Sequence, residues 1–424
     1  MQVIQNPPRT EWNILLSRPS LNNAHLREKV QQVCEQVKQN GDAAVRNYTK
    51  QFDGVDMPSP AVTQQAIDTA EYSLADDLKK AIQQAAANIK LFHEKQLVPP
   101  EMIETMPGIQ CWRRPVGIEK VGLYIPGGSA PLFSTILMLA IPAAIAGCKE
   151  VVLCAPPGKD GRLHPAILYA AKLTGITRVY AIGGVQAIAA MAYGTETVPQ
   201  VYKIFGPGNQ YVTCAKQMVQ EQGIAIDMPA GPSEVCVLAD ETANAAFIAA
   251  DLLSQAEHGP DSQVLLVTTD ASVPQRVNAE IEKQLALLPR KELAAAALAN
   301  SKAVVMDTMH GAMDLVNAYA AEHLILACRN DEELAQQVVN AGSVFLGHYS
   351  PESVGDYASG TNHTLPTNGY AKAYSGVSVD AFVKKITYQR LTTAGLQLIS
   401  DTVIRMAEAE GLDAHAHAVR IRLQ

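Results

Sequence analysis

The chain has 424 residues, too many for one small hydrophobic core, so we expect two or more domains. Hydrophobic residues make up 48% and charged residues 18%, a balance that excludes a disordered or fibrous chain. The 34 Lys and Arg residues are outnumbered by 42 Asp and Glu residues, which gives a formal net charge of -8. Because there is also no basic run, nucleic acid is a poor candidate partner.

The sequence lacks the patterns of membrane insertion and export. Its longest apolar stretch, Ile136 to Cys148, is shorter than the roughly 18 residues of a membrane span and is interrupted by Pro142. The N-terminal segment has no apolar core or cleavage site of the secretory kind. The seven cysteines form no C-x-x-C pair, which argues against a disulfide framework or a thiolate zinc cluster. We therefore expect a cytoplasmic protein that does not bind membranes.

Residues 20–95 predict helices. Residues 27–38 and 76–95 carry apolar residues at helical spacing among charged ones. Turns are predicted at residues 40–42 and 53–54, where Asn, Asp and Gly cluster.

From about residue 120, short Val- and Ile-rich runs alternate with alanine-rich helical stretches. Strands are predicted at residues 121–125, 151–154, 179–182, 202–205, 235–238, 264–267, 304–306 and 344–346. Helices are predicted between them at residues 135–146, 165–174, 210–220, 243–256 and 331–340. Continuous apolar strands that alternate with helices indicate parallel sheets covered on both faces. The run is long enough for two such units, one near 120–232 and one continuing past Ser233.

The polar segment 347–378 interrupts this alternation. It is rich in Gly, Pro, Ser and Asn and is longer than an ordinary connection, which is typical of a functional loop. A helix is predicted from Asp401 to near Gly411, followed by a short terminus rich in His and Arg.

Four glycine-containing junctions follow predicted strands. They are YIPGGSAP (124–131), GGVQA (183–187), FGPGN (205–209) and PAGPSE (229–234). Glycine at the carboxyl edge of a parallel strand lets a ligand approach the backbone, and the next helix N-terminus favours an anion. None matches the G-x-G-x-x-G fingerprint or a P-loop, and each alone is equally well explained as a tight turn. Together they favour a phosphate-containing cofactor.

Two short segments carry candidate catalytic or metal-binding side chains. Gln255 and His258 are three residues apart, so on a helix an amide oxygen and an imidazole nitrogen could face one atom. On spacing alone, a histidine that interacts with the helix dipole is the simpler explanation. Glu322 and His323 lie where a predicted helix meets a strand-like run, and adjacent residues point differently in either element. A carboxylate and an imidazole form the usual acid–base pair, although a solvated Glu beside a partly buried His is the commoner occurrence.

Further candidate ligands lie in the long loop and at the C-terminus. Asp356 and His363 are seven residues apart in the loop, and His415 and His417 lie near the end of the chain. A carboxylate with imidazoles suits zinc, manganese or a related divalent metal. In an extended tail His415 and His417 would share a face, although terminal histidines are often simply exposed. The cysteines lie mostly in or beside apolar strands, so we assign them no role.

Several long segments together resemble the histidinol dehydrogenase family, in the family's order and over nearly the whole chain. These segments are VGLYIPGGSAPLFST (121–135), KIFGPGNQYVT (203–213), IDMPAGPSEV (226–235), DLLSQAEHGPDSQV (251–264), AEHLI (321–325), GSVFLG (342–347), SPESVGDYASGTNHTLPT (350–367) and LDAHAHAV (412–419). The length of these matches makes the resemblance specific.

The resemblance implies one zinc ion per subunit and a set of catalytic residues. Its zinc ligands would be Gln255, His258, Asp356 and His415, with His415, chosen over His417 by its position in the pattern, coming from the partner chain. Glu322 would be the general base and His323 its partner acid–base. The substrate L-histidinol would contact Ser233, His323, His363, Glu410 and the zinc ligands, and the cofactor NAD would contact Tyr124, Gln186 and Asn209.

The resemblance also implies an α/β fold and an intertwined homodimer. The fold would comprise two incomplete Rossmann-like parallel-sheet domains and two small domains built from the chain ends. We expect an N-terminal arm, 1–22, packed with the C-terminal small domains, and a first Rossmann-like domain of 23–120 and 233–375 on the zinc and substrate side. A second domain, 121–232, would bind NAD, and 376–424 would form a small C-terminal domain and a dimer tail that brings Glu410 and His415 to the partner's site.

The family's reaction, the last steps of histidine biosynthesis, oxidises L-histidinol through L-histidinal to L-histidine with two NAD. By resemblance, zinc would hold the substrate, His323 would take the alcohol proton, and Glu322 would activate the water that attacks the aldehyde. A zinc hydrolase is the alternative, since the same side chains could activate water, but a hydrolase needs no dinucleotide loops. A non-catalytic metal-binding or nucleotide-sensing protein is a third hypothesis, which would not require Glu322 and His323 beside the metal.

Overall fold

The structure, a computed structural model, describes residues 1–18, 23–127, 131–229 and 231–424. Its first parallel sheet has the strand order β1-β11-β10-β9-β12-β13. The strands are β1 (Gln2–Gln5), β9 (Glu234–Ala239), β10 (Gln263–Thr268), β11 (Lys302–Val305), β12 (His323–Ala327) and β13 (Ser343–Leu346). Strands β9, β10 and β12 are buried along their whole length, which explains their unbroken apolar sequences.

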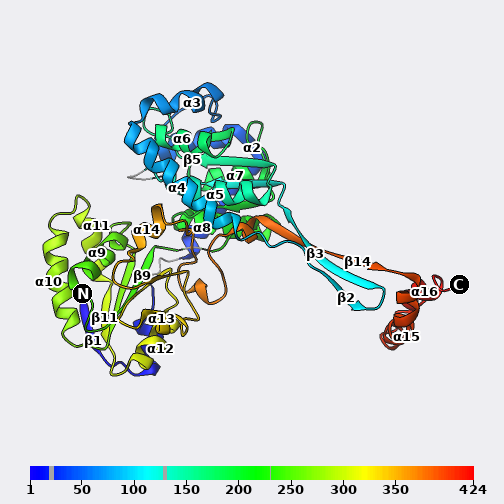
Figure 1. The fold of residues 1–424 in the computed structure, drawn as a ribbon. Coiled ribbons are helices and arrows are strands. Elements are labelled where there is room, and N and C mark those ends of the chain that lie inside the picture. The colour runs from blue at the N-terminus through cyan, green and yellow to red at the C-terminus, as the bar shows by residue number, and fades with distance from the viewer. Residues whose placement is uncertain (19–22, 128–130, 230) are drawn as a thin grey trace.

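Helices cover both faces of this first sheet (Figure 1). Val235 and Val237 of β9 pack with α9 (Ala245–Ala256), α10 (Val273–Leu285) and α11 (Lys291–Ala299). Cys236 and Leu238, which point to the other face, pack with α1 (Trp12–Leu15), α12 (Met309–Tyr319) and α13 (Asp331–Ala335). The side chains alternate because successive strand residues face opposite sides.

The second parallel sheet has the order β6-β5-β4-β7-β8. Its strands are β4 (Lys120–Tyr124), β5 (Glu150–Ala155), β6 (Arg178–Ala181), β7 (Lys203–Phe205) and β8 (Ala225–Ile226), and its helices are α5 (Phe133–Ala146), α6 (Pro165–Leu173), α7 (Gly184–Tyr193) and α8 (Gln210–Glu221). Counted from β4 and from β9, both sheets have the order 3-2-1-4-5, and β1 is added at the edge of the first. The predicted pair of incomplete Rossmann-like units is therefore confirmed.

The three helices between residues 23 and 95 pack on the second sheet rather than the first. Helix α2 (Asn23–Asp53), which is interrupted at Gly41, lies against α7 and α8, whereas α3 (Gln64–Thr69) and α4 (Asp76–Glu94) lie against α6 and α5. The expected grouping of 23–120 with 233–375 is therefore wrong for these helices. Helical periodicity indicates that one face of a helix is buried, but it does not indicate which sheet covers that face.

The N-terminal arm also differs from its expected position. Strand β1 pairs in parallel with β11, and Trp12 and Leu15 are buried in the first unit, so the described part of the arm does not pack with the C-terminal helices. Four residues form this edge strand, too few for an alternation of apolar and polar residues to be recognised.

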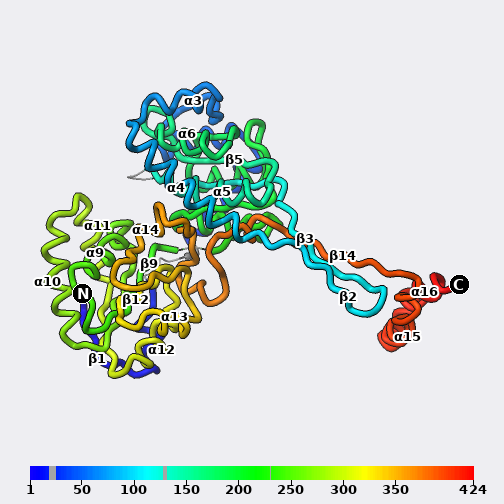
Figure 2. Tube along the Cα trace, viewed as in Figure 1, coloured from blue at the N-terminus to red at the C-terminus, as the bar shows by residue number. Residues whose placement is uncertain are grey.

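A long antiparallel ribbon carries the C-terminal helices away from both sheets (Figures 1 and 2). It consists of β2 (Met102–Met106), β3 (Ile109–Gly117) and β14 (Val383–Leu391), and it leads to α15 (Thr393–Ala409) and α16 (Asp413–Arg420). Residues 102–117 thus join the C-terminal segment by strand pairing. The tail is helical rather than extended, so His415 and His417 do not share a face as expected, because residues two apart diverge on a helix.

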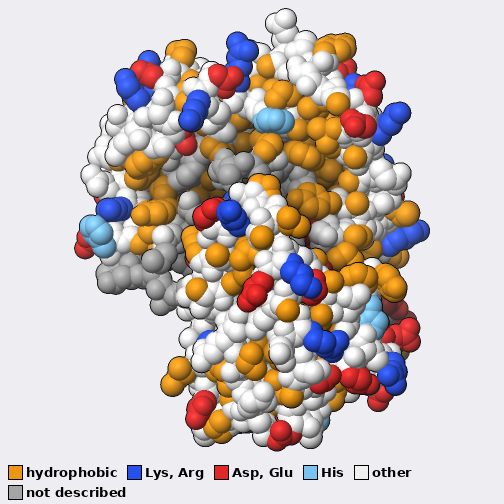
Figure 3. All heavy atoms as spheres, turned by 90° about the vertical axis from the view of Figure 1, so that its left-hand side faces the viewer, with side chains coloured by type: hydrophobic (Ala, Val, Ile, Leu, Met, Phe, Trp, Pro, Cys, Tyr) orange, Lys and Arg blue, Asp and Glu red, His pale blue; other side chains and the backbone are white. Residues whose placement is uncertain are grey.

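Charged side chains of both signs share the surface. On the face in Figure 3, Lys and Arg side chains are interspersed with Asp and Glu side chains. In the described ranges we find no helix whose length and apolar character would let it cross a bilayer.

Candidate active site

The predicted acid–base residues lie at the amino edge of the first sheet. Glu322 immediately precedes β12, His323 is its first residue, and Ser233 immediately precedes β9. The turn from α12 into β12 passes through Ala320, whose φ of 56° is uncommon for a residue with a Cβ. The position is unusual, because open α/β sheets generally bind ligands at the carboxyl edge.

Glu322 and His323 are both buried and converge although they are adjacent in sequence. Glu322 Oε2 lies 3.7 Å from His323 Nδ1. The main chain of Glu234 contacts both side chains: its N–H donates to Glu322 Oε2 at 2.9 Å, and its carbonyl accepts from His323 Nδ1 at 3.2 Å. The side chains can meet because Glu322 belongs to the turn and not to the strand.

Asp356 approaches the other nitrogen of His323. It lies on the short helix α14 (Glu352–Tyr357), within the segment predicted as a loop, and its Oδ1 is 3.3 Å from His323 Nε2. This nitrogen is buried and forms no hydrogen bond with any residue that the structure describes. The imidazole of His323 therefore has one nitrogen held by the main chain and one beside Asp356, a predicted metal ligand.

Gln255 and His258 reach this place from the end of α9. Gln255 is fully buried within the helix, but the helix ends at Ala256, so the two residues do not share a helix face as expected. His258 lies just beyond the end, is exposed, and contacts Ser233 Oγ through Nδ1 at 3.2 Å. Glycine and proline follow His258 at once and stop the helix there.

Glu352 belongs to this cluster, although sequence analysis did not identify it. It is almost fully buried, and with the Gln255 amide oriented so that its donor faces the acceptors, the amide nitrogen donates to the two Glu352 oxygens at 2.7 and 3.0 Å. Ser254 Oγ donates to Oε1 at 3.1 Å, and Oε2 lies 4.0 Å from His323 Nδ1. One signal was available: Glu352 and Asp356 are four residues apart and therefore share a helix face.

Burial and mutual contact shift the pKa values of these groups. Burial raises the pKa of Glu322 and of Glu352 to about 8 each, although the nearby His323 opposes the shift. Burial would lower the pKa of His323, but Glu322, Glu352 and Asp356 outweigh it and raise this pKa to about 10. Burial also acts to raise the pKa of Asp356, but contact with His323 holds it below its ordinary value. The cluster can therefore exchange protons near neutral and alkaline pH.

His363 connects the two units beside this cluster. Its Nδ1 donates to the carbonyl of Asp356 at 2.8 Å, and its Nε2 accepts from Thr135 Oγ1 on α5 at 3.0 Å. A cavity of about 50 Å³ lies where the units meet. Ser233, Glu322 and His363 line one part of it, and Gly206 and Asp227 line another. The amino edge of the first sheet thus faces the carboxyl edge of the second.

The predicted cofactor residues lie around the carboxyl edge of the second sheet. The junctions follow β4, β6, β7 and β8, so their common edge is confirmed for the described residues, while residues 128–130 and 230 lie outside them. The strand order reverses between β4 and β7, and such a switch point is the usual nucleotide site. Gly206 comes directly after β7 in the sequence and has a φ of 125°. It lies so close to the end of β4 that a Cβ at this position would be 2.0 Å from the Tyr124 carbonyl oxygen.

The three predicted contacts differ in exposure. The hydroxyl of the buried Tyr124 accepts from the N–H of Gly184 at 3.1 Å. Gln186 is fully buried, and its Oε1 receives no hydrogen bond from the described residues. Asn209 is exposed, and its side chain caps α8 by accepting from the N–H groups of Tyr211 and Val212 at 3.0 and 3.2 Å.

Glu410 and His415 do not reach this site within one chain. Glu410 ends α15 and His415 lies in α16, at the far end of the ribbon (Figure 1). Within the described ranges of one chain, no group of three or more His, Cys, Asp or Glu side chains is arranged to hold a metal. Of the four predicted ligands, His258 and Asp356 lie near enough to shift each other's pKa, and Gln255 lies against Glu352 of the helix that carries Asp356.

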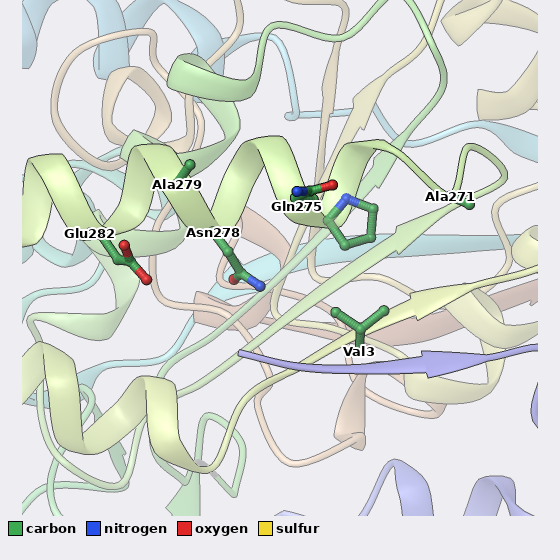
Figure 4. A pocket seen from close by; sticks show the side chains of 7 residues that line it. Val3, Ala271, Gln275, Asn278, Ala279 and Glu282 are labelled. Atoms are coloured by element: carbon green, nitrogen blue, oxygen red, sulfur yellow. The ribbon is translucent and has the colours of Figure 1, made fainter.

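A larger hollow at the outer edge of the first sheet has no comparable chemistry. It measures about 420 Å³ and lies between β1 and α10 (Figure 4). Its polar side chains are Gln275, Asn278 and Glu282, beside Val3 and alanine residues. No imidazole or thiol lines it, so we do not regard it as the active site.

The fold and the site together define an α/β enzyme whose acid–base groups lie between two Rossmann-like units. The family model described as histidinol dehydrogenase matches residues 16–423. The histidinol dehydrogenase of Bacteroides thetaiotaomicron is 57% identical over 423 residues, which cover 100% of this chain and 99% of the relative. That of Vibrio cholerae is 53% identical over 425 residues, covering 100% and 98%. The crystal structure of histidinol dehydrogenase from Elizabethkingia anophelis superimposes with a TM-score of 0.97 at 54% identity, covering 100% and 98%.

The chain belongs to the histidinol dehydrogenase family and is an oxidoreductase of histidine biosynthesis. The resemblance inferred from the sequence is confirmed. The hydrolase and the non-catalytic alternatives are wrong.

Proposed function

We propose that the protein carries out the zinc-dependent, NAD-linked, four-electron oxidation of L-histidinol to L-histidine through L-histidinal. The observation that carries this proposal is the buried contact between Glu322 and His323. Glu322 also lines the cavity where the first sheet meets the carboxyl edge of the second sheet, the edge at which such sheets usually bind nucleotides. Two proton-handling groups suit two successive oxidations, in which an alcohol and then an aldehyde hydrate must each lose a proton.

The donor set at Asp356 supports a zinc ion. An amide oxygen, an imidazole and a carboxylate are ligands that zinc accepts. When the amide nitrogen of Gln255 faces Glu352, the amide oxygen is available to bind a metal. Ser233 contacts Nδ1 of His258, so the other ring nitrogen of His258 is available as well. We infer that Gln255, His258 and Asp356 hold zinc, which when bound would fix the imidazole and amine of the substrate.

In the first oxidation, His323 would accept the proton of the substrate hydroxyl. Nδ1 is held by the Glu234 carbonyl, so Nε2 is the nitrogen that faces the substrate and Asp356. NAD, when bound, accepts the hydride in each oxidation. Tyr124, Gln186 and Asn209 would hold it, and the unpartnered Gln186 Oε1 is available to a donor of the cofactor.

In the second oxidation, Glu322 would remove a proton from water as the water oxygen bonds to the aldehyde carbon, and His323 would return the proton it took in the first oxidation to the aldehyde oxygen, which gives the hydrate. His323 would then take a hydroxyl proton of this hydrate while the second hydride leaves, which yields the carboxylic acid. A water nucleophile requires no thiol. All seven cysteines are free, and burial raises the pKa of the nearby Cys236.

The remaining ligand is proposed to come from a second copy of the chain. The tail helices α15 and α16 pack on each other at the end of the ribbon and expose Leu398, Met406 and Ile421. We infer a homodimer in which Glu410 and His415 complete the partner's site, with Glu410 contacting substrate. The free cysteines are consistent with the proposed cytoplasmic location.

The test is the amount of NADH formed per L-histidinol consumed by zinc-replete protein. Two NADH per substrate are expected from the double oxidation. One would show that the aldehyde is released, which contradicts the proposed role of Glu322. None, from folded and zinc-loaded protein, would overturn the proposed activity.

A further inference from the structure

The N-terminal arm reaches the active site through Arg18. Its Nε and Nη2 donate to the two carboxylate oxygens of Glu234 at 3.0 and 2.9 Å. The Glu234 side chain is 1% exposed and that of Arg18 is 13% exposed. This is a two-point contact, in which the planar guanidinium fixes the direction as well as the charge of the carboxylate.

Glu234 is the residue whose main chain holds both acid–base side chains. Its N–H binds Glu322 and its carbonyl binds His323. Its side chain also accepts from the N–H of Asn368 at 2.7 Å, which ties it to the loop after His363. Any shift of Glu234 would therefore move two hydrogen bonds within the active site.

Arg18 also fixes the turn that leads to Glu322. Its Nη2 donates to the carbonyl of Tyr319 at 2.7 Å, and its guanidinium lies 3.9 Å from the centre of the Tyr319 ring. Tyr319 ends α12, and Ala320, with its positive φ, follows at once. One guanidinium thus joins the start of β9 to the turn before β12, and these two elements carry the acid–base groups.

We propose that Arg18 is a positioning residue that sets the relative placement of Glu322 and His323 through Glu234 and Tyr319. The proposal rests on the proposed function, because it presumes that these two side chains handle the protons of the reaction. Glu234 is buried and would be left as an uncompensated charge without Arg18. A lysine could supply the charge, but not the two-point contact or the stacking on Tyr319.

The test compares Arg18→Gln, Arg18→Lys, Glu234→Gln and the double variant Arg18→Gln/Glu234→Gln. The matched control is Arg9→Gln on the same arm, because Arg9 pairs with Asp314 at 3.4 Å on the surface and its side chain is 78% exposed. The readouts are kcat, KM for L-histidinol, zinc content and the melting temperature.

We expect Arg18→Gln to lower kcat by about 10- to 100-fold with KM changed less than about threefold and zinc retained, because small displacements of reacting groups cost this much. Arg18→Lys should recover part of the loss, and Arg9→Gln should match wild type. The double variant should be no slower than the slower single variant, because the two side chains act as one unit.

The outcomes separate this proposal from the proposed function. Wild-type protein that fails to oxidise L-histidinol overturns the proposed function. If wild type is active and Arg18→Gln lowers the melting temperature but leaves kcat unchanged, the positioning role alone is overturned. That role is also overturned if the kcat losses of the two single variants multiply in the double variant. If Arg18→Gln does not fold, Arg18→Lys decides: a kcat lowered several-fold at a wild-type melting temperature supports the role, and an unchanged kcat overturns it.

Discussion

Glu322 and Glu352 both approach the same nitrogen of His323, but their other contacts differ. Both carboxyl groups are buried and lie within 4.0 Å of His323 Nδ1. Glu352 is occupied by the Gln255 amide and the Ser254 hydroxyl, whereas Glu322 lines the cavity. Glu322 can therefore meet a water molecule, while Glu352 orients a proposed zinc ligand.

Replacing Glu322 should separate the two oxidations. In Glu322→Gln we expect NAD-dependent oxidation of L-histidinal to fall by about 10²- to 10⁴-fold, the usual contribution of a general base. Reduction of L-histidinal by NADH, the reverse of the first oxidation, should persist because it depends on His323. The two half-reactions are measured on the same zinc-loaded variant. Equal losses in both would contradict a role confined to water activation.

The shifted pKa values predict an alkaline rise in activity. The proposed mechanism requires the base forms of Glu322 and His323, and the pKa values of these groups are raised to about 8 and about 10. A raised pKa means that each group keeps its proton until the pH is higher, so kcat/KM for L-histidinol should increase from about pH 7 to about pH 9. A pH–rate profile at saturating NAD checks this. A flat or falling profile over that range would disagree with the assigned proton acceptors.

Removing one proposed ligand should remove the metal. Replacing a residue that only supports a metal ligand typically lowers metal affinity by roughly 10- to 100-fold. His258→Asn is expected to lower zinc affinity by more than this, because it removes a ligating imidazole nitrogen. Zinc per subunit is measured after dialysis at fixed free zinc. His25→Asn is the control, because its side chain is 76% exposed on α2. A zinc-replete His258→Asn variant would rule His258 out as a ligand.

At the scale of elements, an aromatic contact packs the base of the ribbon against the second sheet. Phe382, immediately before β14, is fully buried and stacks on Phe205 of β7 with ring centres 3.9 Å apart. Its carbonyl accepts from the N–H of Ile118 at 2.8 Å, and Lys203 Nζ donates to the Ala381 carbonyl at 2.8 Å. These contacts fix the angle at which the ribbon leaves the second unit.

Shortening the side chain of Phe382 should lower the stability of the protein measurably. Phe382→Ala is expected to lower the free energy of unfolding by about 3–5 kcal/mol, through lost burial and the cavity that remains. The urea midpoint, followed by circular dichroism, reports the change. Leu287→Ala is the control, because Leu287 is 83% exposed. A midpoint equal to that of the control would mean that the ribbon does not depend on this contact.

At the scale of the whole molecule, one chain separates residues that the family resemblance assigns to one site. Glu410 and His415 lie on the tail helices at the end of the ribbon (Figures 1 and 2), whereas His258 contacts Ser233 and Asp356 contacts His323 at the amino edge of the first sheet. The tail exposes apolar side chains that a second copy could cover. A symmetric exchange of tails would complete two sites at once.

Mixed dimers test this exchange. Glu322→Gln chains and His415→Asn chains, each inactive alone, should regain up to about a quarter of wild-type activity after chain exchange, since one site in each mixed dimer has all its parts. The control mixes Glu322→Gln with His258→Asn, whose defects lie in the same part of each chain, so no complete site can form. Confirmed exchange without recovery in the first mixture would argue against a shared site.

The sequence indicated the strands of both parallel sheets where they were buried on both faces, because such strands are unbroken apolar runs. It did not indicate β2 and β14, whose residues are mostly exposed and show no apolar run. Family resemblance supplied the site residues, whereas Arg18, Glu234 and Glu352 were missed. Their role depends on contacts between residues up to 301 positions apart, and no local sequence pattern indicates such contacts.

By itself the sequence determined two alternating α/β units, the glycine junctions after the strands of the second sheet, and the position of Glu322 and His323 at a helix–strand junction. These features follow from local periodicity and from the residue types that turns require. Only the tertiary structure decided which helices cover which sheet, and that the amino edge of the first sheet faces the carboxyl edge of the second. It also placed Arg18 beside Glu234 and carried the tail away from its own site. These arrangements depend on which apolar faces and buried charges satisfy one another in three dimensions, and side chains of similar hydrophobicity do not specify their partners in advance.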